Sequence, residues 1–129
     1  MGYWDVGPFD NTPARDLTED IHAGRFNIEQ FKFEVAGDTY LDADDAAVVL
    51  ALGALIFRPT RQLPDGLTRD DIAGIDTQAN KEWIKAQLPK VFDEETSELY
   101  SLWEYTGEVD RWKEYYPATC TELQKKRAN

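Results

Sequence analysis

Four aspartates about a third of the way along the chain are close enough in sequence to form a cation site. Asp38, Asp42, Asp44 and Asp45 fall within one short stretch, and carboxylate oxygens are the ligands that hard divalent cations prefer. The same residues suit the start of a helix, because Asp42 can act as its N-cap and the following acids face the positive end of the helix dipole. We prefer the helix start, since it explains every aspartate without a metal. A divalent-cation site at this cluster is the alternative.

Candidates for nucleophilic or zinc chemistry are few. His22 is the one histidine of the chain and Cys120 the one cysteine. A zinc site needs several such ligands, and we expect His22 to have a surface or helix-end role. Cys120 falls on an apolar stripe, which does not favour the thiolate that a nucleophile requires. No serine elbow, phosphate-binding loop or nucleotide fingerprint occurs in the sequence. We therefore expect no catalytic residues and no cofactor.

Tyrosines beside acids form a second candidate site in the last third of the chain. Tyr100, Tyr105 and Tyr115 are expected off the inward faces of their helices, near the acids Glu98, Glu104 and Glu114. Tyrosine is enriched in protein interfaces, and the acids would attract a basic partner. The sequence thus indicates a partner surface formed by Tyr100, Glu104, Tyr105 and Tyr115.

The first eleven residues read as an ordered N-terminal arm. Trp4 and Phe9 are large apolar side chains that would pack into the core, and the glycine, proline and Asx residues around them favour turns. Asn11 or the residue after it would cap the first helix. Asp10 and Asn11 also carry side-chain oxygen atoms that could bind a ligand or a divalent cation, so they form a second candidate binding site.

The stretch from residue 42 to residue 57 is the element that the others must surround. After Asp45 it runs through twelve residues without a polar side chain. A helix that is apolar on all sides is buried among other elements, and this one is too short to cross a membrane, which needs about 20 apolar residues. We expect a central buried helix.

Other segments carry narrower apolar stripes at helical spacing. Helices are expected from residue 12 to Gly24, over 26–36, over 77–88 ending at Pro89, over 93–106 ending at Gly107, and from 109 onward with a kink or break at Pro117. Residues 26–36 could also form a strand, but a helix is favoured because Asn27 and Gln30 make a capping-box pair and because nothing else would pair with a strand. The inward faces are expected to carry Ala14, Leu17 and Ile21; Ile28, Phe31 and Val35; Ala79, Trp83 and Ala86, with Ile84 and Leu88 on the shoulder of that face; and Leu99, Leu102, Trp103 and Thr106. Residues 58–76 form a long irregular connection with at most a short helical turn near Thr68.

The sequence therefore predicts a single all-α domain, residues 1–129, with five or six helices around the helix at 42–57. At 129 residues the chain can bury one core. Its 25 acidic and 14 basic residues give a net charge of −11, which opposes binding to nucleic acid and to anionic membranes. A single cysteine allows no internal disulfide, and the N-terminal sequence has no secretory signal pattern. We expect a cytoplasmic location.

The arm and the following helix resemble the opening of a bacterial family catalogued as domain of unknown function 4259. The similarity runs through Gly2, Trp4, Gly7, Phe9, Asp10, Asn11, Ala14, Asp16 and Leu17. Asp5 and Thr12 depart from it, where the family has glycine and aspartate; the second change would weaken any cation site in the arm. Two further similarities cover residues 40–56 and the Ser97-Glu98-Leu99 segment followed by Trp103. The resemblance implies a small, mostly helical, bacterial intracellular domain and brings no activity, substrate or cofactor.

These observations favour a small acidic interaction module without enzymatic activity. Its partner would be a basic protein, and an immunity or antitoxin role against a basic toxin is one concrete form. The alternative is a ligand- or divalent-cation-binding domain that uses Asp10 and Asn11 or the acidic cluster at residues 38–45.

Overall fold

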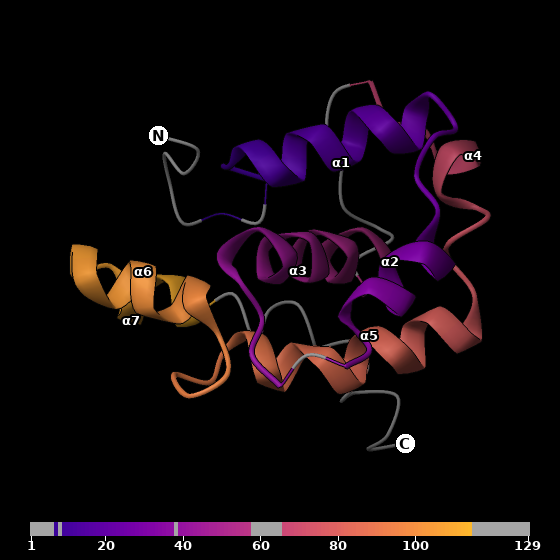
Figure 1. Cartoon of the computed structure of the whole chain (residues 1–129). Coiled ribbons are helices and arrows are strands. Elements are labelled where there is room, and N and C mark those ends of the chain that lie inside the picture. The colour runs from indigo at the N-terminus through magenta and orange to yellow at the C-terminus, as the bar shows by residue number, and fades with distance from the viewer. Residues whose placement is uncertain (1–6, 8, 38, 58–65, 115–129) are drawn as a thin grey trace, which may run out of the picture.

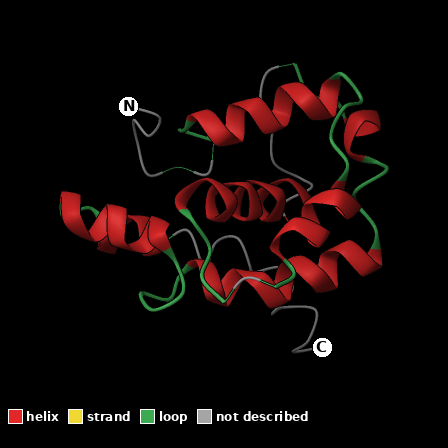
Figure 2. Ribbon diagram, viewed as in Figure 1, coloured by secondary structure: helices red, strands yellow, loops and turns green. Residues whose placement is uncertain are grey.

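The chain folds into helices joined by short turns, as the computed structural model shows for residues 7, 9–37, 39–57 and 66–114. Within these ranges there are seven helices and no strand (Figure 2), so the all-α prediction is confirmed. The helices are α1 (Thr12–His22), α2 (Ile28–Val35), α3 (Ala43–Phe57), α4 (Arg69–Ile72), α5 (Gln78–Val91), α6 (Glu98–Thr106) and α7 (Val109–Lys113). The number exceeds the five or six expected because the turn near Thr68 forms the short helix α4. No helix in the described ranges is long and apolar enough to cross a membrane.

Helix α3 lies at the centre of the molecule. Figure 1 shows α1 on one side of it and α5 on the other, with α6 and α7 near its N-terminal end. Leu50, Leu52, Leu55 and Ile56 are at most 2 % exposed, and twelve of the fifteen residues of the helix are buried. The helix is buried on all sides because its neighbours surround it, as its continuous apolar sequence predicted.

Two carboxylates cap the N-terminus of α3, one local and one from a distant helix. Asp42 Oδ1 accepts a hydrogen bond of 2.8 Å from the Asp45 N–H, which confirms Asp42 as the N-cap. Glu98 Oε1 accepts a second bond of 2.8 Å from the Ala43 N–H. Beside them, Leu41 donates to the Thr96 carbonyl at 2.8 Å and accepts from the Glu98 N–H at 2.9 Å. These bonds tie the start of α6 to the start of α3.

Removing the distant cap should cost stability. Glu98→Ala leaves the Ala43 N–H without its carboxylate, and we expect the free energy of unfolding in urea to fall by about 1 kcal/mol. Glu98→Gln keeps an acceptor and should lose less. The matched control, Glu104→Ala, removes an exposed glutamate of the same helix. Equal losses for Glu98→Ala and Glu104→Ala would show that the cap contributes nothing.

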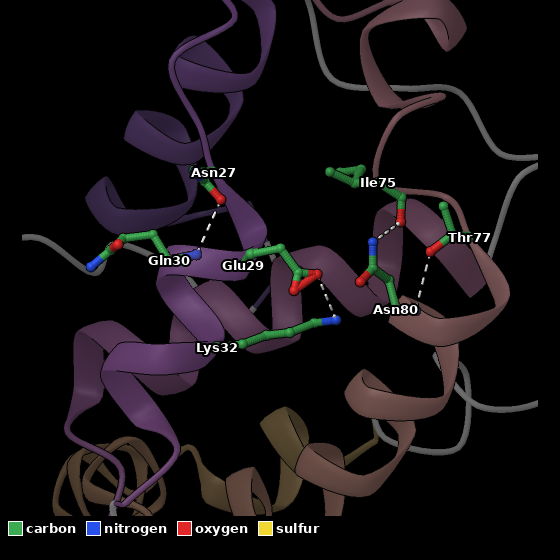
Figure 3. Close-up of polar contacts among 7 residues, drawn as sticks. All are labelled: Asn27, Glu29, Gln30, Lys32, Ile75, Thr77 and Asn80. Carbon is green, nitrogen blue, oxygen red and sulfur yellow. Dashed lines mark hydrogen bonds and ion pairs between the residues drawn. The ribbon is translucent and has the colours of Figure 1, made fainter.

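The first two helices follow their sequence signals. Asn11 caps α1 by accepting the Ala14 N–H at 2.9 Å, and Asn27 caps α2 by accepting the Gln30 N–H at 3.1 Å (Figure 3). The expected inward residues are buried: Ala14, Leu17 and Ile21 in α1, and Ile28, Phe31 and Val35 in α2. The helical prediction for residues 26–36 is confirmed.

The inward face of α5 differs from the prediction. Ala79 and Ala86 are exposed and Trp83 is only half-buried, where its ring meets Phe31 edge-on at 5.9 Å. The buried residues of α5 are Asn80, Ile84, Leu88 and Val91. The prediction failed because the aliphatic side chains bury more apolar area than the two alanines, and this rotates the helix.

Two boundaries also differ. The helix α5 continues past Pro89 to Val91, whose side chain is buried in the last turn of the helix. The helix α6 begins at Glu98 and not at Asp93, because Asp93 caps a tight turn by accepting the Glu95 N–H at 2.9 Å. Its buried stripe is correspondingly short: Leu99 and Trp103 are buried, Leu102 is half-buried and Thr106 is exposed. Gly107, with a φ of 83°, ends α6 as expected.

Candidate functional site

The end of the molecule formed by α6 and α7 carries a concentration of negative charge. We call it the acidic α6–α7 end; its acids are Glu98, Glu104, Glu108, Asp110 and Glu114. The same segment has two cations. Arg111 donates to Glu108 at 2.8 Å, and Lys113 Nζ lies 5.5 Å from the centre of the Tyr100 ring. The acids outnumber the cations, so this end has an excess of negative charge.

Tyr105 is the most exposed large aromatic side chain in the described part of the chain. It is 93 % exposed and follows Glu104, which is also exposed. An aromatic ring in water with an acid beside it is the combination that a basic partner could cover. Of the four residues expected in the partner surface, the consecutive residues Glu104 and Tyr105 of α6 are both exposed.

Tyr100 has a different place from the one predicted. It is half-buried, its ring meets Trp112 edge-on at 5.9 Å, and Lys113 donates to its hydroxyl at 3.5 Å. Trp112 is fully buried and stacks on Phe92 at 4.4 Å. Tyr100 thus helps to fix α7 on α6, and only its outer edge adds to the surface. Tyr115, the fourth predicted residue, lies outside the described residues, as do Cys120 and Pro117.

A cavity of about 460 Å³ lies at a different place, between the turn that joins α1 to α2 and the turn that joins α4 to α5. Its lining residues are Ile21, Gly24, Arg25, Phe26, Asn27, Ile28, Asp71, Gly74 and Ile75. Figure 3 labels two of these residues, Asn27 before α2 and Ile75 before α5; the carbonyl oxygen of Ile75 accepts a hydrogen bond of 3.0 Å from the Asn80 amide. Sequence patterns did not predict this cavity, because its walls come from segments about 50 residues apart.

His22 and Asp71 join α1 to α4 beside this cavity. His22 Nδ1 lies 2.9 Å from Asp71 Oδ2, and the same oxygen accepts the Thr68 N–H at 2.9 Å in the capping box of α4. The hydrogen bond with His22 and that from the Thr68 backbone hold the pKa of Asp71 below its usual value. The helix-end role expected for His22 is what the structure shows.

The lowered pKa of Asp71 predicts a pH dependence. A carboxyl group whose pKa is lower in the folded state stabilises the fold above its unfolded pKa of about 3.9, and this stabilisation is lost as the pH falls through the folded value. Asp71→Asn should therefore be less stable than the wild type at pH 7, and the difference should shrink below about pH 4. Urea unfolding across this range measures it. Asp70→Asn, which removes a neighbouring exposed carboxylate outside the His22 pair, is the control. A difference that stays constant with pH would contradict the account.

The arm residues have structural places where they are described. Gly7 is buried, Phe9 is half-buried against the core, and Asn11 is the 4 % exposed cap of α1. The Asp10 N–H donates to the Gly7 carbonyl at 3.1 Å, which closes a turn. Asp16 is exposed on α1, and Trp4 lies outside the described residues. Asn11 thus uses its side-chain oxygen within the fold.

The acidic cluster at the start of α3 has no metal-binding arrangement in the described ranges. Asp42 is the N-cap, Asp44 and Asp45 have interactions of their own, and Asp38 lies outside these ranges. Among the described residues, no group of three or more histidine, cysteine, aspartate or glutamate side chains could hold a metal ion.

Comparison with known proteins adds a family but no activity. Neither the curated proteins nor the solved structures gave a match to the chain. A family model described as "Domain of unknown function (DUF4259)" matches residues 2–115. The match covers most of the 129 residues, including the arm, all seven helices and both candidate sites. The chain therefore belongs to the DUF4259 family.

Proposed function

We propose that this protein is a non-enzymatic interaction module that binds a basic protein through the acidic α6–α7 end. The observation that carries the proposal is Tyr105, whose side chain is 93 % exposed although burying an aromatic ring is among the most favourable contributions to a protein interface. Glu104 precedes it and is exposed. A basic partner would cover the ring and neutralise the acids around it.

The packing beneath the surface supports this proposal. Trp112, Phe92 and Tyr100 form a contiguous aromatic cluster that holds α7 against α6. Trp103, two residues before Tyr105 in α6, is also buried. Binding to a surface that is already ordered loses less conformational entropy than binding to a flexible one. The backbone at Tyr105 is therefore already ordered before a partner binds.

The charge of the whole chain supports the choice of partner. A net charge of −11 produces a field that attracts basic proteins and raises their association rate, whereas it repels nucleic acid and anionic membranes. An inhibitor of a basic toxin, as in an immunity protein or antitoxin, is one form that this chemistry fits. The single histidine supports a non-enzymatic role, because it joins two helix ends through Asp71.

The proposal predicts that one small patch decides partner capture. The double variant Glu104→Lys/Tyr105→Ala should lose at least about tenfold in capture of a basic protein from a lysate of the source organism, because truncating a central interface residue costs about 2 kcal/mol or more. Capture by the wild type should weaken as salt is raised, since salt screens exposed charges. Quantitative mass spectrometry of the captured proteins measures both effects.

A matched control separates the patch from the net charge. Glu19→Lys/Phe33→Ala makes the same change of charge and also removes one exposed ring, since Phe33 is 78 % exposed and Glu19 is exposed on α1. This variant should capture the partner as the wild type does. Equal loss in both double variants would show that binding depends on overall charge alone, and capture that neither variant nor salt changes would refute the proposal.

A further inference from the structure

The cavity between the α1–α2 turn and the α4–α5 turn is open to solvent and has the size of a small-molecule site, with both apolar and polar groups in its wall. Its volume of about 460 Å³ falls within the range of about 300–1,000 Å³ found for ligand pockets. Such pockets combine apolar walls with a few polar groups that orient the ligand. Here Ile21, Phe26, Ile28 and Ile75 supply the apolar wall, and a cation and a carboxylate lie among them.

One part of the wall carries N–H donors. Arg25 binds Asp20 through Nε, at 3.2 Å, and through one terminal nitrogen, at 3.1 Å. A guanidinium has five N–H donors, so Asp20 engages only some of them. The N-terminus of α2 also reaches the cavity at Asn27 and Ile28. The first backbone N–H groups of a helix carry partial positive charge, and with Arg25 they favour a carboxylate.

The other charged group of the wall is negative. Asp71 Oδ2 accepts hydrogen bonds from the Thr68 N–H and from His22, and these two contacts hold the carboxylate in place. An ionised carboxylate has about four acceptor positions on its two oxygens, so these contacts leave capacity for an ammonium group. The hydrogen bonds also keep the pKa of Asp71 below its usual value, and the group is charged at neutral pH.

The net charge of the chain discriminates between ligand classes. A purely anionic ligand at Arg25 would be repelled by the net charge of −11. A purely cationic ligand would find exposed carboxylates over much of the surface and gain little from this particular cavity. A zwitterion has no net charge to be repelled, and it can use Arg25 and Asp71 together.

We infer that this cavity binds a free α-amino acid with an apolar side chain, or an equally small apolar zwitterion. The ligand carboxylate is placed toward Arg25 and the N-terminus of α2, its ammonium group toward Asp71, and its side chain against the isoleucines and Phe26. This site is separate from the acidic α6–α7 end and does not depend on the proposed partner. Figure 1 shows the α1–α2 and α4–α5 turns, which line the cavity, on the opposite side of α3 from α6 and α7.

The test is titration of the intact protein with L-leucine and L-phenylalanine, in which NMR of the backbone amides monitors binding. We expect saturable shifts at Gly24 and Gly74, which line the cavity, with a dissociation constant of about 1 mM or lower. 4-Methylpentanoate lacks the ammonium group and 3-methylbutylamine lacks the carboxylate. Each analogue should bind at least about tenfold more weakly than L-leucine.

Variants of the wall complete the test. Arg25→Gln changes a side chain that is 66 % exposed, so the fold should be kept, and affinity should fall about tenfold. Gly74→Leu should block binding, because an added Cβ meets nothing within 4 Å and the larger side chain occupies open space at the wall. Gly37→Leu adds the same side chain at a glycine that is equally open but lies outside the cavity. This control should bind as the wild type does.

Three results would overturn the inference. The first is the absence of saturable shifts with both amino acids up to about 10 mM, a concentration that would detect even weak binding. The second is binding that folded Gly74→Leu protein retains, since the ligand would then lie elsewhere. The third is equal affinity for L-leucine and 4-methylpentanoate, which would make the site a simple anion site.

Discussion

Replacing Leu52 with alanine should lower the free energy of unfolding by about 2–5 kcal/mol, the range for truncation of a leucine in a packed core. Leu52 is 0 % exposed, near the middle of α3. The helices α1, α5 and α6 all contact α3, and a cavity in α3 weakens the element that they share. Small single domains unfold with a total of about 5–15 kcal/mol, so this one substitution removes a large part of the stability. Urea unfolding followed by circular dichroism measures the change.

The control for this prediction is an exposed residue of similar size. Phe33→Ala removes a side chain that is 78 % exposed on α2 and should change the stability by no more than about 0.5 kcal/mol. If Leu52→Ala were as mild as Phe33→Ala, the central position of α3 in the core would be contradicted.

Replacing Trp112 with alanine should destabilise the protein by about 3–5 kcal/mol, the range for truncation of a large aromatic residue. Trp112 is fully buried, stacks on Phe92 after α5 and meets Tyr100 in α6. The substitution removes the ring contacts that hold α7 to the rest of the fold. The same variant should lose partner capture, because the acidic α6–α7 end depends on this packing.

A conservative variant separates packing from hydrogen bonding. The Trp112 Nε1 has no hydrogen-bond partner among the described residues, and a buried donor without a partner lowers stability. Trp112→Phe removes that donor and keeps a ring for stacking, so it should cost clearly less than Trp112→Ala. Equal losses measured by urea unfolding would show that the indole nitrogen contributes a bond that this account lacks.

Sequence patterns predicted the parts of the fold that depend on neighbouring residues. The apolar run of α3 and the caps Asn11, Asn27 and Asp42 could be predicted because each acts within a few residues of its own helix. The capping contact of Glu98 on the Ala43 N–H could not, since 55 residues separate the two. The inward face of α5 was wrong because periodicity alone does not tell small alanines from the aliphatic side chains that gain more by burial.

The candidate sites show the same division. The exposure of Tyr105 beside Glu104 agrees with the sequence pattern, because Tyr105 falls off the buried face of a regular helix. Tyr100 was also expected off the buried face, but it packs on Trp112, a contact that depends on where α7 turns back. The cavity around Asp71 could not be predicted at all, since α1, α2 and α4 meet there only in the folded chain.

The measurement that most directly tests the interaction module is site-specific photocrosslinking in cells of the source organism. A photoreactive phenylalanine analogue placed at Tyr105 should give a crosslinked product that contains a basic protein, because the side chain is exposed at the acidic α6–α7 end. The same analogue at Phe33, which is also exposed, should give none. A product at Phe33 alone, products of equal yield at both positions, or no product at Tyr105 would contradict the proposal that this end of the molecule binds the partner.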